Sequence, residues 1–177
     1  MLFNSSNSNF TKTFINTKMK SIKKTKLILY SIYIILIDQI SKFSLMNTLE
    51  FEKSINIIPN LLDFTLVKNK GAAFSLFSNS IGPLTIISFL ASISLLIIIL
   101  RFTPKSYWNS LGLAYLLGGT VGNGIDRLLK GYVIDFIDLV PIDFPIFNVA
   151  DISINIAIVC FIFDLIKSKD KSRLTIK

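Results

Sequence analysis

Four apolar segments constrain the fold of this chain more than any other feature. They span roughly residues 27–46, 81–100, 109–128 and 146–166. Each is close to the length of about 20 residues that a helix needs to cross the hydrocarbon core of a bilayer. A segment in lipid must satisfy its own backbone polar groups, so it forms a helix or part of a closed barrel. The sequence therefore predicts an all-α membrane protein with four transmembrane helices.

The composition agrees with a membrane protein and removes several kinds of chemistry. Hydrophobic residues make up 51% of the 177 residues, and the mean hydropathy of +0.61 exceeds that of soluble domains. The chain has no histidine, which excludes a Ser-His-Asp triad. Its single cysteine, Cys160, lacks a disulfide partner and cannot build a metal site alone. We predict no metal and no cofactor.

Basic residues lie beside the ends of the apolar segments. One group precedes the first segment, a second separates the second and third segments, and a third follows the fourth. The groups are Lys18, Lys20, Lys23, Lys24 and Lys26; Arg101 and Lys105; and Lys167, Lys169, Lys171 and Arg173. The positive-inside rule then places both termini in the cytoplasm and the connections 47–80 and 129–145 outside. We interpret the net charge of +8 as an orientation signal and predict no nucleic-acid partner.

Polar ends divide the chain into three parts. Residues 1–26 are rich in Asn, Ser, Thr and Lys and contain no acid, which predicts a disordered basic cytoplasmic extension. This segment lacks the arginines of a transit peptide, and Met19 is an alternative start of translation. Residues 27–166 form the predicted four-helix membrane domain, and residues 167–177 form a basic cytoplasmic tail.

The first outer connection contains a pattern typical of a strand. Branched and aromatic residues dominate 61–67, and Gly71 a few positions later indicates a turn. We therefore expect a small extracytoplasmic β-containing loop region at the membrane surface, in addition to the helices.

Small residues recur in the third apolar segment. Ala114, Gly118 and Gly122 follow one another every four residues. This spacing lets helix backbones approach closely in a bilayer. We predict that this face of the helix packs against a neighbouring helix.

Acidic residues within or beside the apolar segments are the strongest indication of function. A carboxylate near hydrocarbon is costly and suggests a functional site. With about 1.5 Å of rise per residue, Asp126 lies roughly 25 Å above the cytoplasmic start of its helix near Asn109. Asp151 lies about 22 Å above the cytoplasmic end of its helix near Ile166. Asp135, predicted in the outer loop, can reach the same level near the outer membrane edge.

The chemistry open to these residues is that of paired carboxylates. Two aspartates a few ångströms apart cannot both ionise, so the pKa of one falls and that of the other rises. The ionised member can take a proton from water as it attacks a carbonyl, and the protonated member can donate to the carbonyl oxygen. A Ser-Lys pair is the weaker alternative, because Lys42 has Asp38 one helical turn away as its counter-ion.

Two other interpretations remain at this stage. Asp38, Asp126 and Asp151 are candidates for a proton relay in a small transporter, although no internal repeat accompanies them. A purely structural interpretation pairs Asp126 with Arg127 and Asp151 with Asn148, and makes the chain a membrane anchor for a partner. It leaves the placement of Asp135 and Asp151 unexplained, which favours a carboxylate pair that activates water at the outer membrane edge.

Five short blocks of sequence, in order, resemble the signature of lipoprotein signal peptidase (signal peptidase II). The blocks are Asp38-Gln39 with Lys42; Asn69-Lys70-Gly71-Ala72-Ala73-Phe74; Gly118-Gly119-Thr120-Val121-Gly122-Asn123-Gly124-Ile125-Asp126-Arg127; Val133-Ile134-Asp135-Phe136; and Phe147-Asn148-Val149-Ala150-Asp151. Each block alone is weak, but five in order on a four-helix topology are specific. The resemblance covers roughly residues 27–166.

The resemblance implies an aspartic endopeptidase of the bacterial cytoplasmic membrane, with its active site at the extracytoplasmic face. Such enzymes remove signal peptides from prolipoproteins by cutting before a cysteine that carries diacylglycerol. By motif position, Asp135 and Asp151 are the catalytic pair, and Asp126 organises Arg127 and the nearby loop. The positions that bind substrate or support the site are Asn69, Asn123, Arg127, Asn148, Asp38 and Lys42.

The resemblance also suggests partners, and the sequence departs from the family pattern at one position. Lipid-modified prolipoproteins and membrane lipids are the expected partners of a monomeric enzyme. Gly124 stands where the family usually has a larger apolar residue, which predicts a looser end of the third helix.

Overall fold

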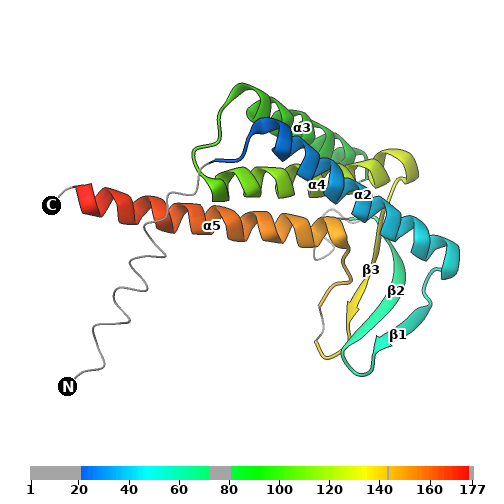
Figure 1. Cartoon of the computed structure of the whole chain (residues 1–177). Coiled ribbons are helices and arrows are strands. Elements are labelled where there is room, and N and C mark those ends of the chain that lie inside the picture. The colour runs from blue at the N-terminus through cyan, green and yellow to red at the C-terminus, as the bar shows by residue number, and fades with distance from the viewer. Residues whose placement is uncertain (1–20, 72–80, 143, 176–177) are drawn as a thin grey trace, which may run out of the picture.

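The computed structural model describes residues 21–71, 81–142 and 144–175. Four helices and three strands make up these residues. In chain order they are α2 (Lys24–Thr48), β1 (Ser54–Ile58), β2 (Leu62–Asn69), α3 (Ile81–Arg101), α4 (Tyr107–Lys130), β3 (Val133–Leu139) and α5 (Val149–Thr175). The helices run side by side, and the sheet lies at the end of the bundle where α2 finishes and α5 begins (Figure 1). We call this the sheet end.

Three of the helices are long and apolar enough to cross a membrane. They are α2, α3 from Gly82, and α5 as far as Ser168. The fourth, α4, has 24 residues and packs against the other three, with glycines and polar residues facing its neighbours. Because lipid-facing side chains must be apolar whereas protein-facing ones need not be, a central helix has a weaker apolar signal. The structure thus shows a mostly helical membrane fold, and the crossing of α4 stays a prediction.

Glycines allow α4 to occupy this central place. A Cβ atom at Gly118 would lie 2.8 Å from a side-chain carbon of Ile34 on α2. One turn later, a Cβ atom at Gly122 would lie 2.7 Å from the Asp38 carboxylate. The predicted small-residue face therefore packs on α2. A second close approach, which the spacing did not predict, brings Gly119 against Ala150 on α5.

The chain leaves α4 by a sharp turn at Gly131. This glycine has a φ of 74°, a left-handed conformation that other residues adopt at a cost, and its N–H donates to the Arg127 carbonyl at 3.1 Å. The turn leads directly into β3. A strand whose first four residues are buried therefore begins within three residues of the end of α4.

The sheet is antiparallel, with the order β1-β2-β3. The predicted strand at 61–67 corresponds to β2. Our placement of Asp135 in a loop was wrong, because it lies in β3 opposite Val67 of β2. The branched and aromatic residues on both sides of Asp135 are themselves typical of a strand. Leu66, Ile134 and Phe136 form a buried core that packs against the last turns of α2 and so fixes the sheet to the bundle.

The helix boundaries differ from the predicted ones at both ends of the chain. α2 begins at Lys24 instead of residue 27, while residues 1–20 of the predicted extension lie outside the described residues. α5 begins at Val149 instead of residue 146, and it continues to Thr175 through most of the predicted tail. Hydropathy marks where lipid ends, whereas a helix continues until its hydrogen bonding stops.

Replacing Gly119 by alanine should destabilise the protein. The added methyl group would lie 2.5 Å from the Ala150 carbonyl oxygen, so α4 and α5 must separate, at a cost of about 1–3 kcal/mol. Gly124→Ala is the matched control, because its methyl group would meet Ser88 at an ordinary 3.6 Å. Thermal unfolding in detergent measures both variants. Equal melting temperatures would show that the α4–α5 contact is not tight.

Candidate active site

Two aspartates from different elements meet at one asparagine. Asp135 lies on β3 with 1% of its surface exposed, and Asp151 lies in the first turn of α5. The side-chain amide of Asn148 donates to Asp135 Oδ1 at 2.6 Å, and its backbone N–H donates to Asp151 Oδ2 at 3.2 Å. The structure therefore brings the predicted pair together at the sheet end.

Asn148 and Asp151 also form the cap that starts α5. The Asn148 side-chain oxygen accepts from the Asp151 N–H at 3.0 Å, while Asp151 accepts from the Asn148 N–H. This reciprocal arrangement is a capping box, and it explains why the helix starts at Val149. The free N–H groups at a helix N-terminus also favour a nearby negative charge. The pattern Asn-x-x-Asp is a helix-start signal that our sequence reading missed.

Amide groups hold both carboxylates from the remaining sides. Asn69 on β2 donates its side-chain N–H to Asp135 Oδ2 at 2.8 Å. Asn123 on α4 donates to Asp151 Oδ1, also at 2.8 Å. Each of the four carboxylate oxygens therefore accepts a hydrogen bond from an amide. The predicted Asn69 block continues into residues 72–74, which lie outside the described residues.

A buried lysine connects this site to α2. Lys42 Nζ lies 2.9 Å from Asp38 Oδ2, 2.8 Å from Asp126 Oδ2 and 3.1 Å from Asn123 Oδ1. The three donors of the ammonium group thus meet three acceptors. The expected Asp38–Lys42 pair is present, and Asp38 also accepts from the Ala150 N–H at 2.9 Å. Because Asn123 turns its oxygen to Lys42, its NH₂ group must face Asp151.

Asp126 and Arg127 do not form the ion pair that we considered, as far as the described residues show. Asp126 instead pairs with Lys130 at 2.6 Å and accepts from the Ile134 N–H at 3.3 Å. The Arg127 guanidinium donates to Ser88 on α3 at 3.2 Å. Neighbours on a helix point about 100° apart, so Asp126 faces α2 and the sheet while Arg127 faces α3. A serine in an apolar segment gave no signal, and Ser88 was missed.

The environment of Asp135 prepares it for proton transfer. Burial, and then the charge of Asp151, raise the pKa of Asp135 from its usual 3.8 to about 6. The hydrogen bonds from Asn69 and Asn148 oppose this rise but do not cancel it. A carboxyl group that titrates close to neutral pH can act as an acid or a base under physiological conditions.

The described residues contain no group of three or more Asp, Glu or Cys side chains arranged to hold a metal ion. Around the pair the polar contacts come from amides, which orient carboxylates without neutralising them. What this arrangement can do chemically is accept a proton at one carboxylate and donate one from the other.

Replacing Lys42 by methionine should strongly destabilise the protein. It would leave the buried carboxylates of Asp38 and Asp126 without their shared cation, and breaking a buried pair in this way costs about 3–5 kcal/mol. Lys130→Met is the matched control, because the Lys130 side chain is 26% exposed and should contribute less than about 1 kcal/mol. Unfolding in detergent distinguishes the two. A similar loss in both variants would argue against the buried network.

Replacing Asp135 by asparagine should change how stability depends on pH. The folded state holds the Asp135 proton more tightly than the unfolded state does. The protonated carboxyl group therefore contributes to the free energy of unfolding in full below about pH 4, and this stabilisation is lost as the pH rises through about 6. The difference in pKa corresponds to at most about 3 kcal/mol. The stability of Asp135→Asn relative to the parent should therefore increase between pH 4 and 7. Asp138→Asn on the same strand controls for the loss of an acid, and a constant difference would contradict the expectation.

Comparisons with known proteins identify the family of this chain. The family model for signal peptidase (SPase) II matches residues 30–167. The lipoprotein signal peptidase of Parasynechococcus marenigrum (strain WH8102) is 46% identical over 140 residues, covering 79% of this chain and 88% of the relative. That of Synechococcus sp. (strain RCC307) is 43% identical over 148 residues, covering 83% and 98%.

A solved bacterial membrane enzyme has the same fold. It superposes with a TM-score of 0.77 and 31% identity, and the match covers 88% of this chain and 96% of that structure. The five sequence blocks, the membrane helices and these similarities agree with one another. The chain therefore belongs to the signal peptidase II family.

Proposed function

We propose that this protein removes signal peptides from diacylglyceryl-modified prolipoproteins, cutting before the lipidated cysteine, with Asp135 and Asp151 as the catalytic pair. A peptidase of the signal peptidase II type follows from the family. The observation that carries the catalytic assignment is the meeting of the two carboxylates at Asn148, one from the sheet and one from a helix start.

The pair activates water by sharing one proton. The ionised carboxylate takes a proton from the water, and the water oxygen bonds to the carbonyl carbon of the scissile peptide. The protonated carboxyl group gives its proton to the carbonyl oxygen. When the tetrahedral intermediate collapses, the C–N bond breaks, the leaving nitrogen takes a proton from one carboxyl group, and a hydroxyl of the intermediate returns its proton to the other carboxylate, which leaves a carboxylic acid and an amine. Close contact of like charges keeps the doubly ionised form unfavourable, so one proton stays in the pair.

The surrounding amides keep the pair in place and leave its reactive faces to substrate and water. Asn69, Asn123 and Asn148 each donate to one of the carboxylates, and Lys42 fixes the orientation of Asn123. Arg127 is held at Ser88 by one N–H and experiences the charges of both catalytic aspartates. Its other donors suit carbonyl oxygens of a substrate or phosphate oxygens of a lipid.

The same proposal places the enzyme in the bacterial cytoplasmic membrane, with both termini inside and the site at the extracytoplasmic face. The distribution of positive charge supports this orientation. Lys24 begins α2 and Arg101 ends α3, and Lys24 donates to the carbonyl of Leu100 at 2.8 Å. This basic end of the bundle lies opposite the sheet end (Figure 1). Lipid-modified prolipoproteins and membrane lipids are the proposed partners of a monomeric enzyme.

The arrangement of the acids disfavours a transporter. A proton relay needs titratable groups at successive depths across the membrane. Asp38 and Asp126 instead share one lysine, and that lysine contacts the same asparagine that holds Asp151. All three acids therefore belong to one cluster at the sheet end.

Asparagine at either catalytic position should abolish processing. Removing a group that transfers a proton lowers the rate by at least about a hundredfold. Asp135→Asn and Asp151→Asn are reconstituted separately with a lipidated precursor, and cleavage is followed by gel shift. Asp138→Asn, which changes an acid on the same strand that bonds Thr65, should process normally. Normal processing by either catalytic variant, with folding verified by thermal unfolding, would refute the assignment.

A further inference from the structure

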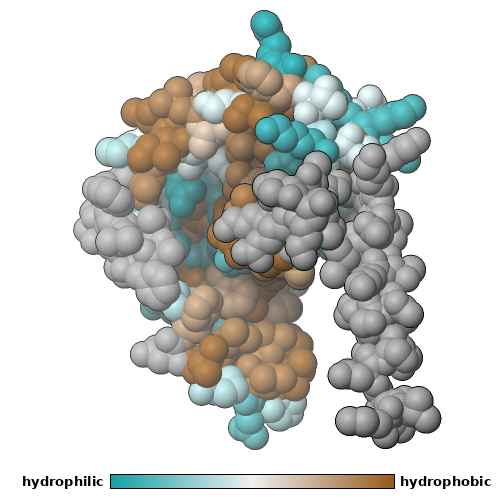
Figure 2. Space-filling model, turned by 90° about the vertical axis from the view of Figure 1, so that its left-hand side faces the viewer, coloured by the Kyte–Doolittle hydropathy of each residue, from teal (hydrophilic) through white to brown (hydrophobic). Residues whose placement is uncertain are grey.

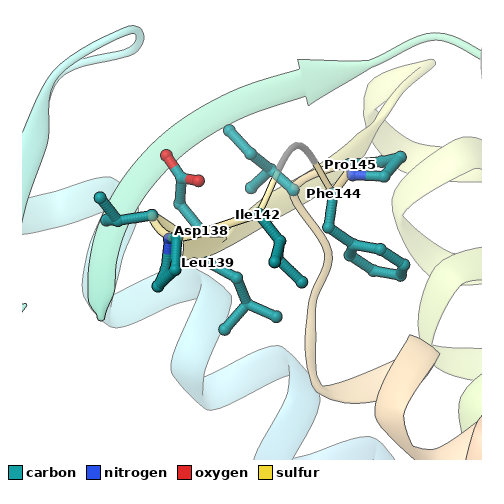
Figure 3. A pocket seen from close by; sticks show the side chains of 8 residues that line it. Asp138, Leu139, Ile142, Phe144 and Pro145 are labelled. Atoms are coloured by element: carbon teal, nitrogen blue, oxygen red, sulfur yellow. The ribbon is translucent and has the colours of Figure 1, made fainter. Parts of the chain in front are cut away.

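The connection between β3 and α5 exposes apolar side chains. Val140, Ile142 and Phe144 are 48%, 56% and 45% exposed, and prolines at 141 and 145 lie between and beside them. We call these five residues the anchor loop. They are among the eight residues, all between 138 and 146, that line a cavity of about 700 Å³. Ile142 and Phe144 extend to one side of the chain, while the carboxylate of Asp138 points to the other (Figure 3).

The anchor loop lies on the side of the sheet that faces back along the helices. At the sheet end, the sheet extends away from the axis of α5. The anchor loop leads from β3 to α5 on the side of the sheet that faces the rest of α5 (Figure 1). Figure 2 shows the molecule from the end of the helices opposite the sheet end. The part of the sheet region that is visible from there, at the bottom of the view, is covered mainly by hydrophobic residues. In a bilayer that α5 crosses, this hydrophobic surface would face the lipid.

The backbone of the anchor loop is also suited to lipid. The N–H groups of Val140, Ile142 and Phe144 donate to backbone carbonyls, at 3.2, 3.2 and 2.8 Å. The two prolines have no N–H to satisfy. Backbone donors in a low-dielectric medium must be paired within the protein, and loops at the surface usually pair some of theirs with water. Here the described donors between 140 and 145 need no water.

We propose that the anchor loop inserts into the lipid leaflet at the sheet end of the membrane. The helix that follows it, α5, also exposes apolar side chains, among them Ile158 and Val159, each 50% exposed. An apolar surface of this kind is unfavourable in water and favourable in the boundary between headgroups and acyl chains. The occupant is therefore lipid, and neither a peptide nor a second copy of the chain.

Insertion would set the depth of the catalytic pair. Asp135 precedes the anchor loop on β3, and Asp151 follows it on α5, so the loop joins the two elements that carry the pair. A loop held in the leaflet fixes the height of both carboxylates relative to the lipid surface. This consequence rests on the proposed function, but the insertion itself does not.

Site-directed fluorescence tests the insertion without any need for catalysis. A polarity-sensitive probe is attached to Ile142→Cys in a Cys160→Ala background, and the protein is reconstituted in vesicles of phosphatidylethanolamine and phosphatidylglycerol. Lys53→Cys, exposed before β1, reports the aqueous side, and Ile97→Cys on α3, with Ile97 50% exposed, reports lipid. Quenching by spin-labelled lipid should be several-fold stronger at 142 than at 53, and quenching by iodide several-fold weaker.

Three results would overturn the proposal. Iodide quenching at 142 as strong as at 53, without lipid quenching, would place the loop in water. Protection that appears only when a lipidated precursor is added would assign the loop to substrate. Protection that appears only at a high protein-to-lipid ratio would assign it to a second copy. If the catalytic variants keep their activity but the probe enters lipid, the proposed function fails while the insertion stands.

The effect on activity is a separate measurement. Ile142→Asp should reduce cleavage of a precursor embedded in vesicles several-fold, because it replaces an apolar side chain that is 56% exposed by a second carboxylate next to Asp143. Cleavage of the same precursor in detergent micelles should stay close to that of the parent. Ile55→Asp, a matched change of an exposed isoleucine on β1, should affect neither measurement. Equal losses in vesicles and micelles would point to a folding defect and contradict a role in lipid.

Discussion

Lys42 carries a charge inside the helix bundle, with 1% of its side chain exposed, and the site is built around it. A buried ammonium group is tolerable only when acceptors surround it, and here they come from α2 and α4. Asp38, one of these acceptors, also bonds the first turn of α5 through the Ala150 N–H. The requirement to satisfy one cation therefore joins three helices at the sheet end.

The proposed catalytic pair depends on this junction. Asp151 is placed by the capping box that begins α5, and Asp135 by a strand that starts within three residues of the end of α4. Asn148 donates hydrogen bonds to both carboxylates. Asn123 accepts a hydrogen bond from Lys42 and donates one to Asp151, so it links the lysine to this carboxylate. Rigid elements hold every group around the carboxylates. Preorganisation of this kind is what the proposed mechanism requires of the two carboxyl groups.

Local patterns predicted what local physics controls. Apolar runs of about 20 residues located the helices, because lipid demands that length. The helix spacing of Asp38 and Lys42 predicted their pair, since residues four apart share a face. The strand around Asp135 and the start of α5 were misplaced, although both patterns were present in the residues. We interpreted these two segments by hydropathy, whereas the branched and aromatic residues of β3 and the capping residues of α5 were the informative features.

By itself, the sequence determined that this chain is a membrane protein of the signal peptidase II type. Length, hydropathy and five short blocks suffice for that, because each is a property of neighbouring residues. Only the tertiary structure decided that Lys42 joins Asp38 to Asp126, that Ser88 holds Arg127, and that Asn148 bonds Asp135. These contacts connect residues 39 to 84 positions apart or unite a strand with a helix start. They form only when the glycines of α4 allow the helices to close.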